Sequence, residues 1–222
     1  MTGLGEVTVE EKPRSLEERI MNVVKEDFYL ISPWIIVLWP FNFEPEKPIV
    51  LPIYVKHKSQ IHRGEIIFKV GRYDKNKTQQ NTIYIVPDTR ESPISMISRN
   101  PHFEIKVSIT GGRLLVYLRD KSKFGTYLNG KKLTKEEKIL NKSAEIHFFI
   151  PSYYLPPNPH EYTLGFKYSL IRKENLPSKD VEFATPSNPV YLTLRKSPDW
   201  YEKFLAFYLK EKNAIKLSLY GS

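Results

Sequence analysis

The chain has no cysteine among its 222 residues. A disulfide scaffold, a thiolate metal site and a cysteine nucleophile are therefore excluded. It also has no apolar run long enough to span a bilayer, because the most hydrophobic stretch, residues 28–41, is short and contains two prolines. The beginning of the sequence, MTGLGEVTVEEKPRS, lacks the apolar segment of a secretory signal. These absences predict an intracellular protein with no membrane partner.

Catalytic and metal-binding patterns are also scarce. The five histidines are scattered, and His57 and His62 do not have the spacing of metal ligands. The sequence contains no Walker loop, no Gly-x-Ser-x-Gly element and no paired carboxylates in an acid–base context. We therefore expect a protein that is not an enzyme and that uses no metal and no cofactor.

Acidic residues are fewer than basic ones: the chain has 25 Asp and Glu residues and 34 Lys and Arg residues, for a formal net charge of +9. This excess favours an anionic partner, which could be a nucleic acid, a membrane surface or a phosphorylated protein. The lysines are spread along the whole chain, and no aromatic RNA-binding motif accompanies them. Direct nucleic-acid binding is therefore an alternative that the sequence does not favour.

Short β-type runs follow one another from residue 34 onward, among them EIIFKVGR, FEIKVSI and RLLVYLRD. They are rich in Ile, Val, Tyr and Phe, and turn signals separate them; the pair Gly111-Gly112 predicts a hairpin between two of the runs. Many short strands at about ten-residue spacing, without a βαβ alternation, predict an all-β sandwich or barrel.

Two helices are predicted outside the β region. Ser15 and Glu18 form a capping-box pattern that precedes an apolar stripe, which predicts an amphipathic helix over 15–26. The sequence Ser-Pro-Asp at 197–199 is a typical helix start and predicts a helix over 198–210 with an aromatic face. Both helices are candidates for contacts with other subunits of a multiprotein complex.

Three regions follow from these patterns. We expect a flexible leader with the short helix over 1–32, a β-sandwich over 33–173, and a C-terminal extension with a strand and a helix over 174–222.

Polar loop residues recur in a fixed order between the β runs. Gly71-Arg72 ends the run EIIFKV, the sequence SRNPH at 98–102 precedes FEIKVSI, and DKSKFGTYLNG occupies 120–130. Each pattern alone is weak, but the ordered set is specific. It resembles the forkhead-associated (FHA) domain family over roughly 33–170. The resemblance implies an FHA-type β-sandwich whose loops at one end bind phosphothreonine peptides.

The resemblance also implies roles for individual residues. Six residues are expected to bind the phosphopeptide: Arg72, Ser98, Arg99, Lys123, Phe124 and Thr126. Five others are expected to maintain the geometry of the loops: Gly71, His102, Gly125, Asn129 and Gly130. The chemistry agrees, because a phosphate carries a charge of about −1.5 to −2 at neutral pH and three acceptor oxygens. An arginine fork and a serine hydroxyl are suitable donors for such a group.

Two departures from the family pattern affect these expectations. The family has two residues between its serine and its histidine, whereas three residues separate Ser98 from His102. Either a bulge accommodates the additional residue, Pro101, or the phosphate loop is displaced. Phe124 stands where the family has an asparagine before Gly-Thr, and this substitution resembles the nibrin branch of the family, the phosphopeptide-binding subunit of a DNA double-strand-break repair nuclease complex. Other FHA adaptors, ubiquitin-ligase FHA modules and checkpoint-kinase regulatory domains remain alternatives.

The sequence thus predicts a non-catalytic adaptor that binds phosphothreonine-containing proteins, in nuclear signalling or the DNA-damage response. The alternative is a structural subunit with a degenerate FHA domain that no longer binds phosphate. The sequence does not identify the phosphorylated partner.

Overall fold

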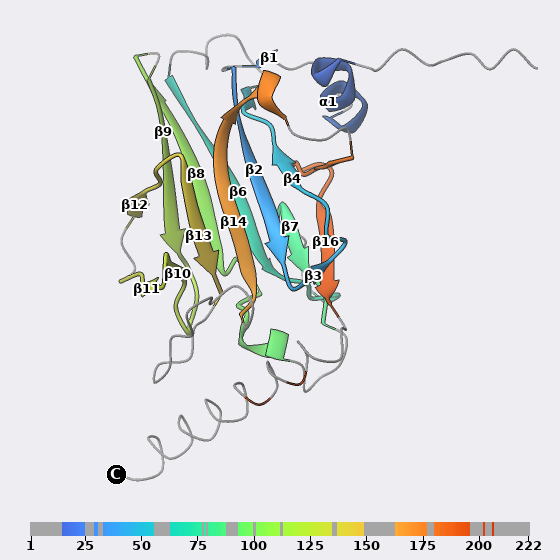
Figure 1. Cartoon of the computed structure of the whole chain (residues 1–222), viewed down its shortest axis with the longest axis vertical. Helices are drawn as coiled ribbons and strands as arrows, with labels where there is room; N and C mark the ends of the chain where they lie inside the picture. Colours follow the sequence, from blue (N-terminus) through green and yellow to red (C-terminus); the bar gives the residue numbers. More distant parts are fainter. Residues whose placement is uncertain are drawn as a thin grey trace, which may run out of the picture.

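The computed structural model describes the following residues: 15–24, 29–30, 33–55, 63–76, 78, 80–87, 93–99, 101–111, 113–134, 137–148, 163–176, 180–195, 202 and 206. Two seven-stranded sheets face one another within this part of the chain (Figure 1). The predicted all-β class is therefore confirmed, and the architecture is a β-sandwich with a short N-terminal helix.

The first sheet is antiparallel except at one edge, where β15 pairs in parallel with β4. Its strands, in order across the sheet, are β11 (Lys131–Lys132), β10 (Tyr127–Leu128), β13 (Ser143–His147), β14 (Gly165–Arg172), β2 (Trp34–Phe41), β4 (Ile49–Leu51) and β15 (Glu182–Phe183). A separate pair of two-residue strands consists of β1 (Tyr29–Leu30) and β5 (Tyr54–Val55).

The second sheet carries the loops that contain predicted site residues. Its strands, in order, are β12 (Glu137–Ile139), β9 (Arg113–Asp120), β8 (Phe103–Thr110), β6 (Arg63–Arg72), β7 (Ile83–Ile85), β16 (Val190–Leu194) and β3 (Phe43–Glu44). Strand β7 pairs in parallel with both β6 and β16. Two 3₁₀ turns complete the described elements, η2 (Pro93–Met96) and η4 (Lys173–Asn175).

The predicted turns form where small residues permit a left-handed backbone. Thr110 pairs with Arg113 at the end of the β8–β9 hairpin, and Gly111 has a φ of 56°. Asn129 and Gly130, which join β10 to β11, have φ values of 49° and 78°. A hairpin of this handedness follows the twist of its strands, which explains the preference for Asn-Gly.

Between the two sheets lies a core that contains a cluster of aromatic rings. Phe43 stacks on Phe166 at 5.9 Å between ring centroids, and Phe103 and Phe148 lie 5.5 Å apart. Tyr168 is fully buried in the same core, and its hydroxyl has no hydrogen-bond partner among the described residues. Burial raises the pKa of this phenol above its ordinary value.

A second hydrophobic cluster lies on the outer face of the first sheet, beneath helix α1 (Leu16–Val24). Ile20 is fully buried there, and Lys173 Nζ lies 2.5 Å from a Glu17 carboxylate oxygen. The capping box is present: Glu18 N–H donates to the Ser15 hydroxyl, and Ser15 N–H donates to the Glu18 carboxylate. The predicted helix start is therefore confirmed, while the end predicted at residue 26 lies outside the described residues.

The C-terminal part contributes strands to both sheets. β15 lies at an edge of the first sheet, and β16 lies between β7 and β3 in the second. The strands of the sandwich thus continue beyond residue 173, where the sequence analysis placed the boundary of an extension. Of the helix predicted over 198–210, the structure describes only Glu202 and Ala206, both helical. The other residues of that helix lie outside the described part, as do most of those in the leader over 1–32.

No helix in the described ranges has the length and hydrophobicity needed to cross a membrane.

Replacement of Tyr168 by phenylalanine is expected to raise the free energy of unfolding by about 1 kcal/mol, because a buried hydroxyl without a partner keeps its desolvation cost. Urea denaturation measures this change. Tyr84→Phe is the matched control, because the Tyr84 hydroxyl oxygen accepts a hydrogen bond from the Asn81 N–H at 2.8 Å. Loss of this hydrogen bond should lower the free energy of unfolding. Equal destabilisation by both substitutions would contradict the assignment.

Candidate functional site

Strand register brings three loops together at one end of the sandwich. Val70, near the end of β6, pairs with Phe103 at the start of β8, and Phe103 pairs with Asp120 at the end of β9. The segments that follow β6, precede β8 and follow β9 therefore leave the second sheet at the same end, the lower end in Figure 1. These segments, together with the end of β6, contain most of the site residues predicted from the ordered motifs.

Ser98 connects the three loops through hydrogen bonds. Its carbonyl accepts from the Arg72 backbone N–H at 2.9 Å, and its own N–H donates to Nδ1 of His102 at 2.9 Å. Its hydroxyl oxygen accepts from the Lys123 backbone N–H at 3.1 Å. One residue thus fixes the end of β6, the start of β8 and the loop after β9 relative to one another.

Gly71 permits the close approach of the first two loops. A Cβ at this position would lie 2.8 Å from the Arg99 carbonyl oxygen and 3.0 Å from the Ser98 carbonyl oxygen. Asn81 completes the contact, because its side-chain amide donates to the Arg99 carbonyl at 2.9 Å. The sequence analysis missed Asn81, which has no motif of its own and lies 18 residues away from its partner.

His102 is buried, with 1% of its surface exposed. Since Nδ1 accepts the Ser98 N–H, the ring proton resides on Nε2, which lies 3.0 Å from the Phe148 carbonyl and 3.3 Å from the Gly125 carbonyl. Burial lowers the pKa of His102 from 6.5 to about 4, although the nearby Asp120 carboxylate opposes the shift. The imidazole is therefore neutral at physiological pH.

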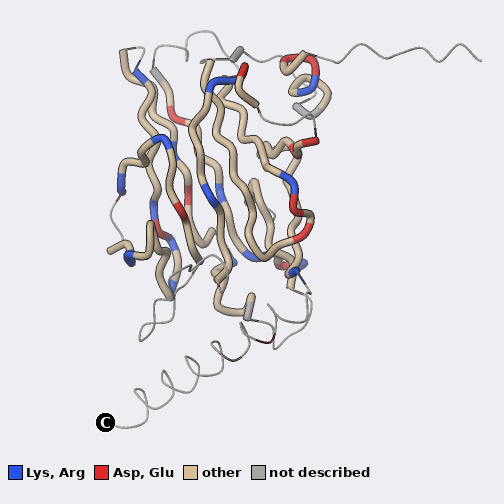
Figure 2. The backbone as a smooth tube through the Cα atoms, in the orientation of Figure 1, with Lys and Arg blue, Asp and Glu red and all other residues tan. Residues whose placement is uncertain are grey.

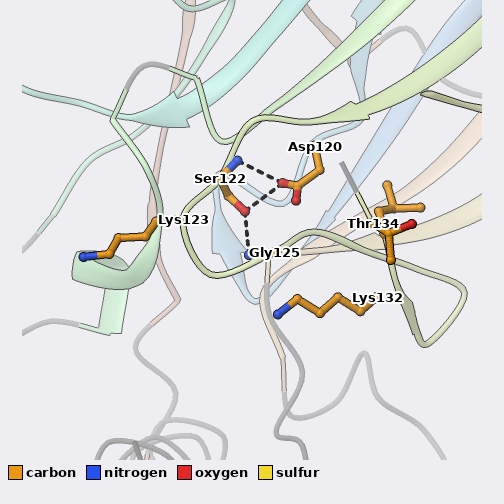
Figure 3. A pocket seen from close by; sticks show the side chains of 7 residues that line it. Asp120, Ser122, Lys123, Gly125, Lys132 and Thr134 are labelled. Atoms are coloured by element: carbon orange, nitrogen blue, oxygen red, sulfur yellow. Dashed lines mark hydrogen bonds between the residues drawn. The ribbon is translucent and has the colours of Figure 1, made fainter. Parts of the chain in front are cut away.

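The loop after β9 is organised around Asp120. Its Oδ1 accepts hydrogen bonds from the Ser122 N–H, the Ser122 hydroxyl and the Thr126 hydroxyl, at 2.9, 2.7 and 2.7 Å. The Ser122 oxygen in turn accepts the Gly125 N–H at 2.6 Å, as Figure 3 shows. Asp120 and Ser122 belong to the recognised motif, but the sequence analysis assigned no role to either residue.

The position of Thr126 corrects one prediction. Thr126 was expected among the residues that bind the phosphopeptide, but its side chain is fully buried. Its hydroxyl donates to Asp120 and its carbonyl accepts the Leu133 N–H, so its side chain maintains the loop and is not available to a peptide. The motif could not reveal this, because sequence order does not show on which side of a loop a hydroxyl lies.

Arg72 and Arg99 place positive charge at the same end. The pKa of Arg72 is lowered, first by burial and then by the like charge of Arg99, while Asp74 acts in the opposite direction. Arg99 is half exposed and pairs with Asp74 at 3.1 Å. The Nε of Arg72 is buried and has no hydrogen-bond partner among the described residues. Such a pair of cations is unfavourable in the free protein and is suited to an anion.

Lys123 and Phe124 lie on the surface of the loop after β9. Lys123 is exposed, and its ammonium lies 5.8 Å from the centre of the Phe124 ring. Asn129 and Gly130 lie farther along, in the turn between β10 and β11. There the Asn129 side-chain oxygen accepts the Glu145 N–H at 2.7 Å, which attaches the turn to β13. The structure therefore brings Arg72, Ser98, Arg99 and Lys123 together. The Asn-Gly turn lies apart from them and is attached to β13.

The additional residue between Ser98 and His102 does not separate these two residues. The Ser98 backbone N–H donates to the His102 ring, and Ser98 also contacts Arg72 and Lys123. Residue 100 lies outside the described part of the chain. Among the described residues, no three His, Asp or Glu side chains are grouped in a way that could bind a metal ion.

The neutral state of His102 has a consequence for stability. Above pH 6.5 both the folded and the unfolded chain hold a neutral ring, but below it only the unfolded chain gains the proton. The free energy of unfolding should therefore fall between pH 6.5 and 4, by on the order of 3 kcal/mol from this residue. Urea denaturation of the wild type and of His102→Gln across this range measures the effect. Parallel profiles for the two proteins would contradict it.

Comparison with known proteins finds a family model that matches part of the chain. Residues 68–149 match the family model described as FHA domain. No match was found among curated proteins.

Several solved structures are similar at low identity. An engineered FHA with a Myc-pTBD peptide is 18% identical, with 65% of this chain and 99% of that chain covered and a TM-score of 0.41. The N-terminal FHA domain of S. cerevisiae Rad53p, in complex with a phosphothreonine peptide, is 19% identical, with coverage of 64% and 98% and a TM-score of 0.37. The yeast Pml1 splicing factor is 16% identical, with coverage of 74% and 97% and a TM-score of 0.38.

These matches do not point to the nibrin branch. The matched segment begins within β6 and includes β8, β9 and the three loops that meet at Ser98. The similarity to the FHA domain model is limited to residues 68–149.

Proposed function

We propose that this protein is a non-catalytic adaptor that binds phosphothreonine-containing protein segments at the loops joined by Ser98. FHA domains are non-catalytic phosphopeptide-binding modules, and the family match supports this assignment. The observation that carries the proposal is the proximity of two like charges: Arg99 lies near a partly buried Arg72, whose Nε has no hydrogen-bond partner in the described ranges. Both residues are neighbours of Ser98: the Arg72 N–H donates to the Ser98 carbonyl, and Arg99 follows Ser98 in the chain.

A dianionic phosphate fits this arrangement in charge and in donor geometry. The Arg72 guanidinium supplies a planar fork of donors, and the Ser98 hydroxyl can donate while its oxygen accepts the Lys123 N–H. Charge-assisted hydrogen bonds contribute about 1.5–3 kcal/mol each, from which the costs of association and peptide ordering are subtracted. The expected affinity is roughly micromolar, which suits reversible signalling.

The alternative of a degenerate domain is less well supported. In that reading Pro101 displaces the phosphate loop, but Ser98 keeps its hydrogen bonds to Arg72, His102 and Lys123. Direct nucleic-acid binding as the main role also has little support, because Lys and Arg are spread over both sheets (Figure 2). A role in nuclear DNA-damage signalling is a finer proposal, supported only by the sequence KFGT with its Phe124.

The phosphothreonine proposal predicts a strict dependence on the phosphate. A fluorescein-labelled peptide library with a fixed central phosphothreonine should bind, and the same library with unmodified threonine should not. Fluorescence anisotropy with the full chain measures both. Equal affinity for the two libraries would refute the proposal.

Arg72→Ala is expected to weaken binding of the phosphothreonine library about ten- to hundredfold, because it removes at least one charge-assisted hydrogen bond. Arg113→Ala is the matched control, since Arg113 is an exposed arginine at the far end of β9 and should bind as the wild type does. Thermal denaturation verifies that both variants fold. If the folded Arg72→Ala variant bound the phosphothreonine library as tightly as the wild type does, residues other than Arg72 would have to bind the phosphate.

A further inference from the structure

Two cations lie against one tryptophan at the end of the sandwich away from the phosphate loops. The Nζ of Lys142 lies 5.7 Å from the centre of the Trp34 ring, and the guanidinium carbon of Arg172 lies 5.6 Å from it. Both cationic residues are exposed, and Trp34 is half-buried. An aromatic ring attracts cations at this range, so Trp34 holds two positive charges close together at the surface.

Strand register explains why these three residues meet. Trp34, the first residue of β2, pairs with Arg172, the last residue of β14. The carbonyl of Lys142 accepts the Leu170 N–H at 2.8 Å, which fixes the start of β13 beside the end of β14. Three segments far apart in the sequence thus form one cluster, and no motif in any of them indicates it.

Carboxylates do not neutralise this cluster within the described part of the chain. Neither Lys142 nor Arg172 has an ion pair there, whereas the adjacent Lys173 is paired with Glu17. Because both distances to the cations start at the same ring centre, the two charged groups are at most about 11 Å apart. That separation is close to the screening length of about 8 Å at physiological ionic strength. A negatively charged ligand at Trp34 is therefore attracted by both charges.

The cluster is well separated from the phosphate loops. Trp34 begins β2, and Phe41 ends this strand where β14 begins and β13 ends. Phe148, the residue after β13, has its carbonyl 3.0 Å from the ring nitrogen of His102. Seven residue steps along a strand span about 23 Å. A ligand at Trp34 thus leaves the phosphate loops accessible to a second ligand.

Cations beside an aromatic ring match the chemistry of a single-stranded nucleic acid. The positive side chains of such sites contact the phosphate backbone, and the aromatic rings stack on bases. A strand carries one phosphate for about every 3.4 Å of helix axis, so Lys142 and Arg172 can contact phosphates of the same strand. The net charge of +9 attracts a polyanion from a distance. An acidic peptide matches these charges but has no base for the ring of Trp34.

We propose that Trp34, Lys142 and Arg172 form a binding site for a single-stranded nucleic acid. The two cations bind phosphates of one strand, and the accessible part of the Trp34 ring contacts a base. This inference goes beyond the proposed function and does not rest on it, because none of the three residues belongs to the loops joined by Ser98. Together, the two sites link a nucleic acid at one end of the sandwich to a phosphorylated protein at the other.

The test uses the full chain and fluorescein-labelled oligothymidylate and oligouridylate of about 20 nucleotides, which distinguish DNA from RNA. Fluorescence anisotropy should detect binding of at least one of them at about 50 mM salt and a loss of affinity towards about 200 mM. Absence of binding at the lower salt concentration would overturn the inference. So would displacement by a phosphothreonine peptide, or displacement by polyglutamate of equal length as effective as that by unlabelled oligonucleotide.

Lys142→Gln and Arg172→Gln should each weaken oligonucleotide binding about two- to fivefold. Each should also reduce the slope of log K against log salt concentration by about 0.7, the value of one phosphate contact on a single strand. Lys167→Gln is the matched control, because it removes the same charge from an exposed lysine in the middle of β14, and its affinity should stay within twofold of the wild type.

Trp34→Leu keeps an apolar side chain but removes the ring, and it should weaken oligonucleotide binding fivefold or more, the effect of one lost stacking contact. Thermal denaturation verifies that each variant folds. Wild-type affinity in folded Trp34→Leu would contradict the inference. An equal loss of affinity in Lys142→Gln and Lys167→Gln would also contradict it, because the effect would then reflect net charge alone.

Discussion

The candidate site depends on the hydrogen bonds that Ser98 makes to three separate segments. Loops have no regular ladder of backbone hydrogen bonds, so each needs other partners to keep a fixed position. Here one carbonyl, one N–H and one hydroxyl supply them, to Arg72, His102 and Lys123 respectively. These hydrogen bonds hold the backbone at Arg72 and at Lys123 close to Ser98.

The sandwich itself makes the connection possible. The ends of β6, β8 and β9 lie side by side because the antiparallel register aligns Val70, Phe103 and Asp120. The aromatic core beneath them, with Phe103 and Phe148 in contact, gives the loops a rigid base. Binding and specificity residues are commonly carried on loops that such a scaffold positions.

Within this frame, neutral and charged groups are separated by burial. His102 is enclosed and remains uncharged, so it can accept the Ser98 N–H and orient the loop. Arg72 lies close to Arg99, and its pKa is lowered first by burial and then by the like charge of Arg99. Positive charge that is already oriented requires little reorganisation when an anion binds, so fixed loops favour the phosphate binding proposed above.

Local patterns in the sequence determined the β-strands, the capped start of α1 and the order of the loops that carry Arg72 and Ser98. These features depend on residues near one another in the chain, such as alternating apolar side chains or the Ser15 and Glu18 pair. Only the tertiary structure decided that Thr126 faces inward, that β15 and β16 complete the two sheets, that Asn81 holds the Arg99 loop, and that two cations lie against Trp34. Each of these depends on contacts with other strands or loops, and no local pattern encodes which partner a residue will meet.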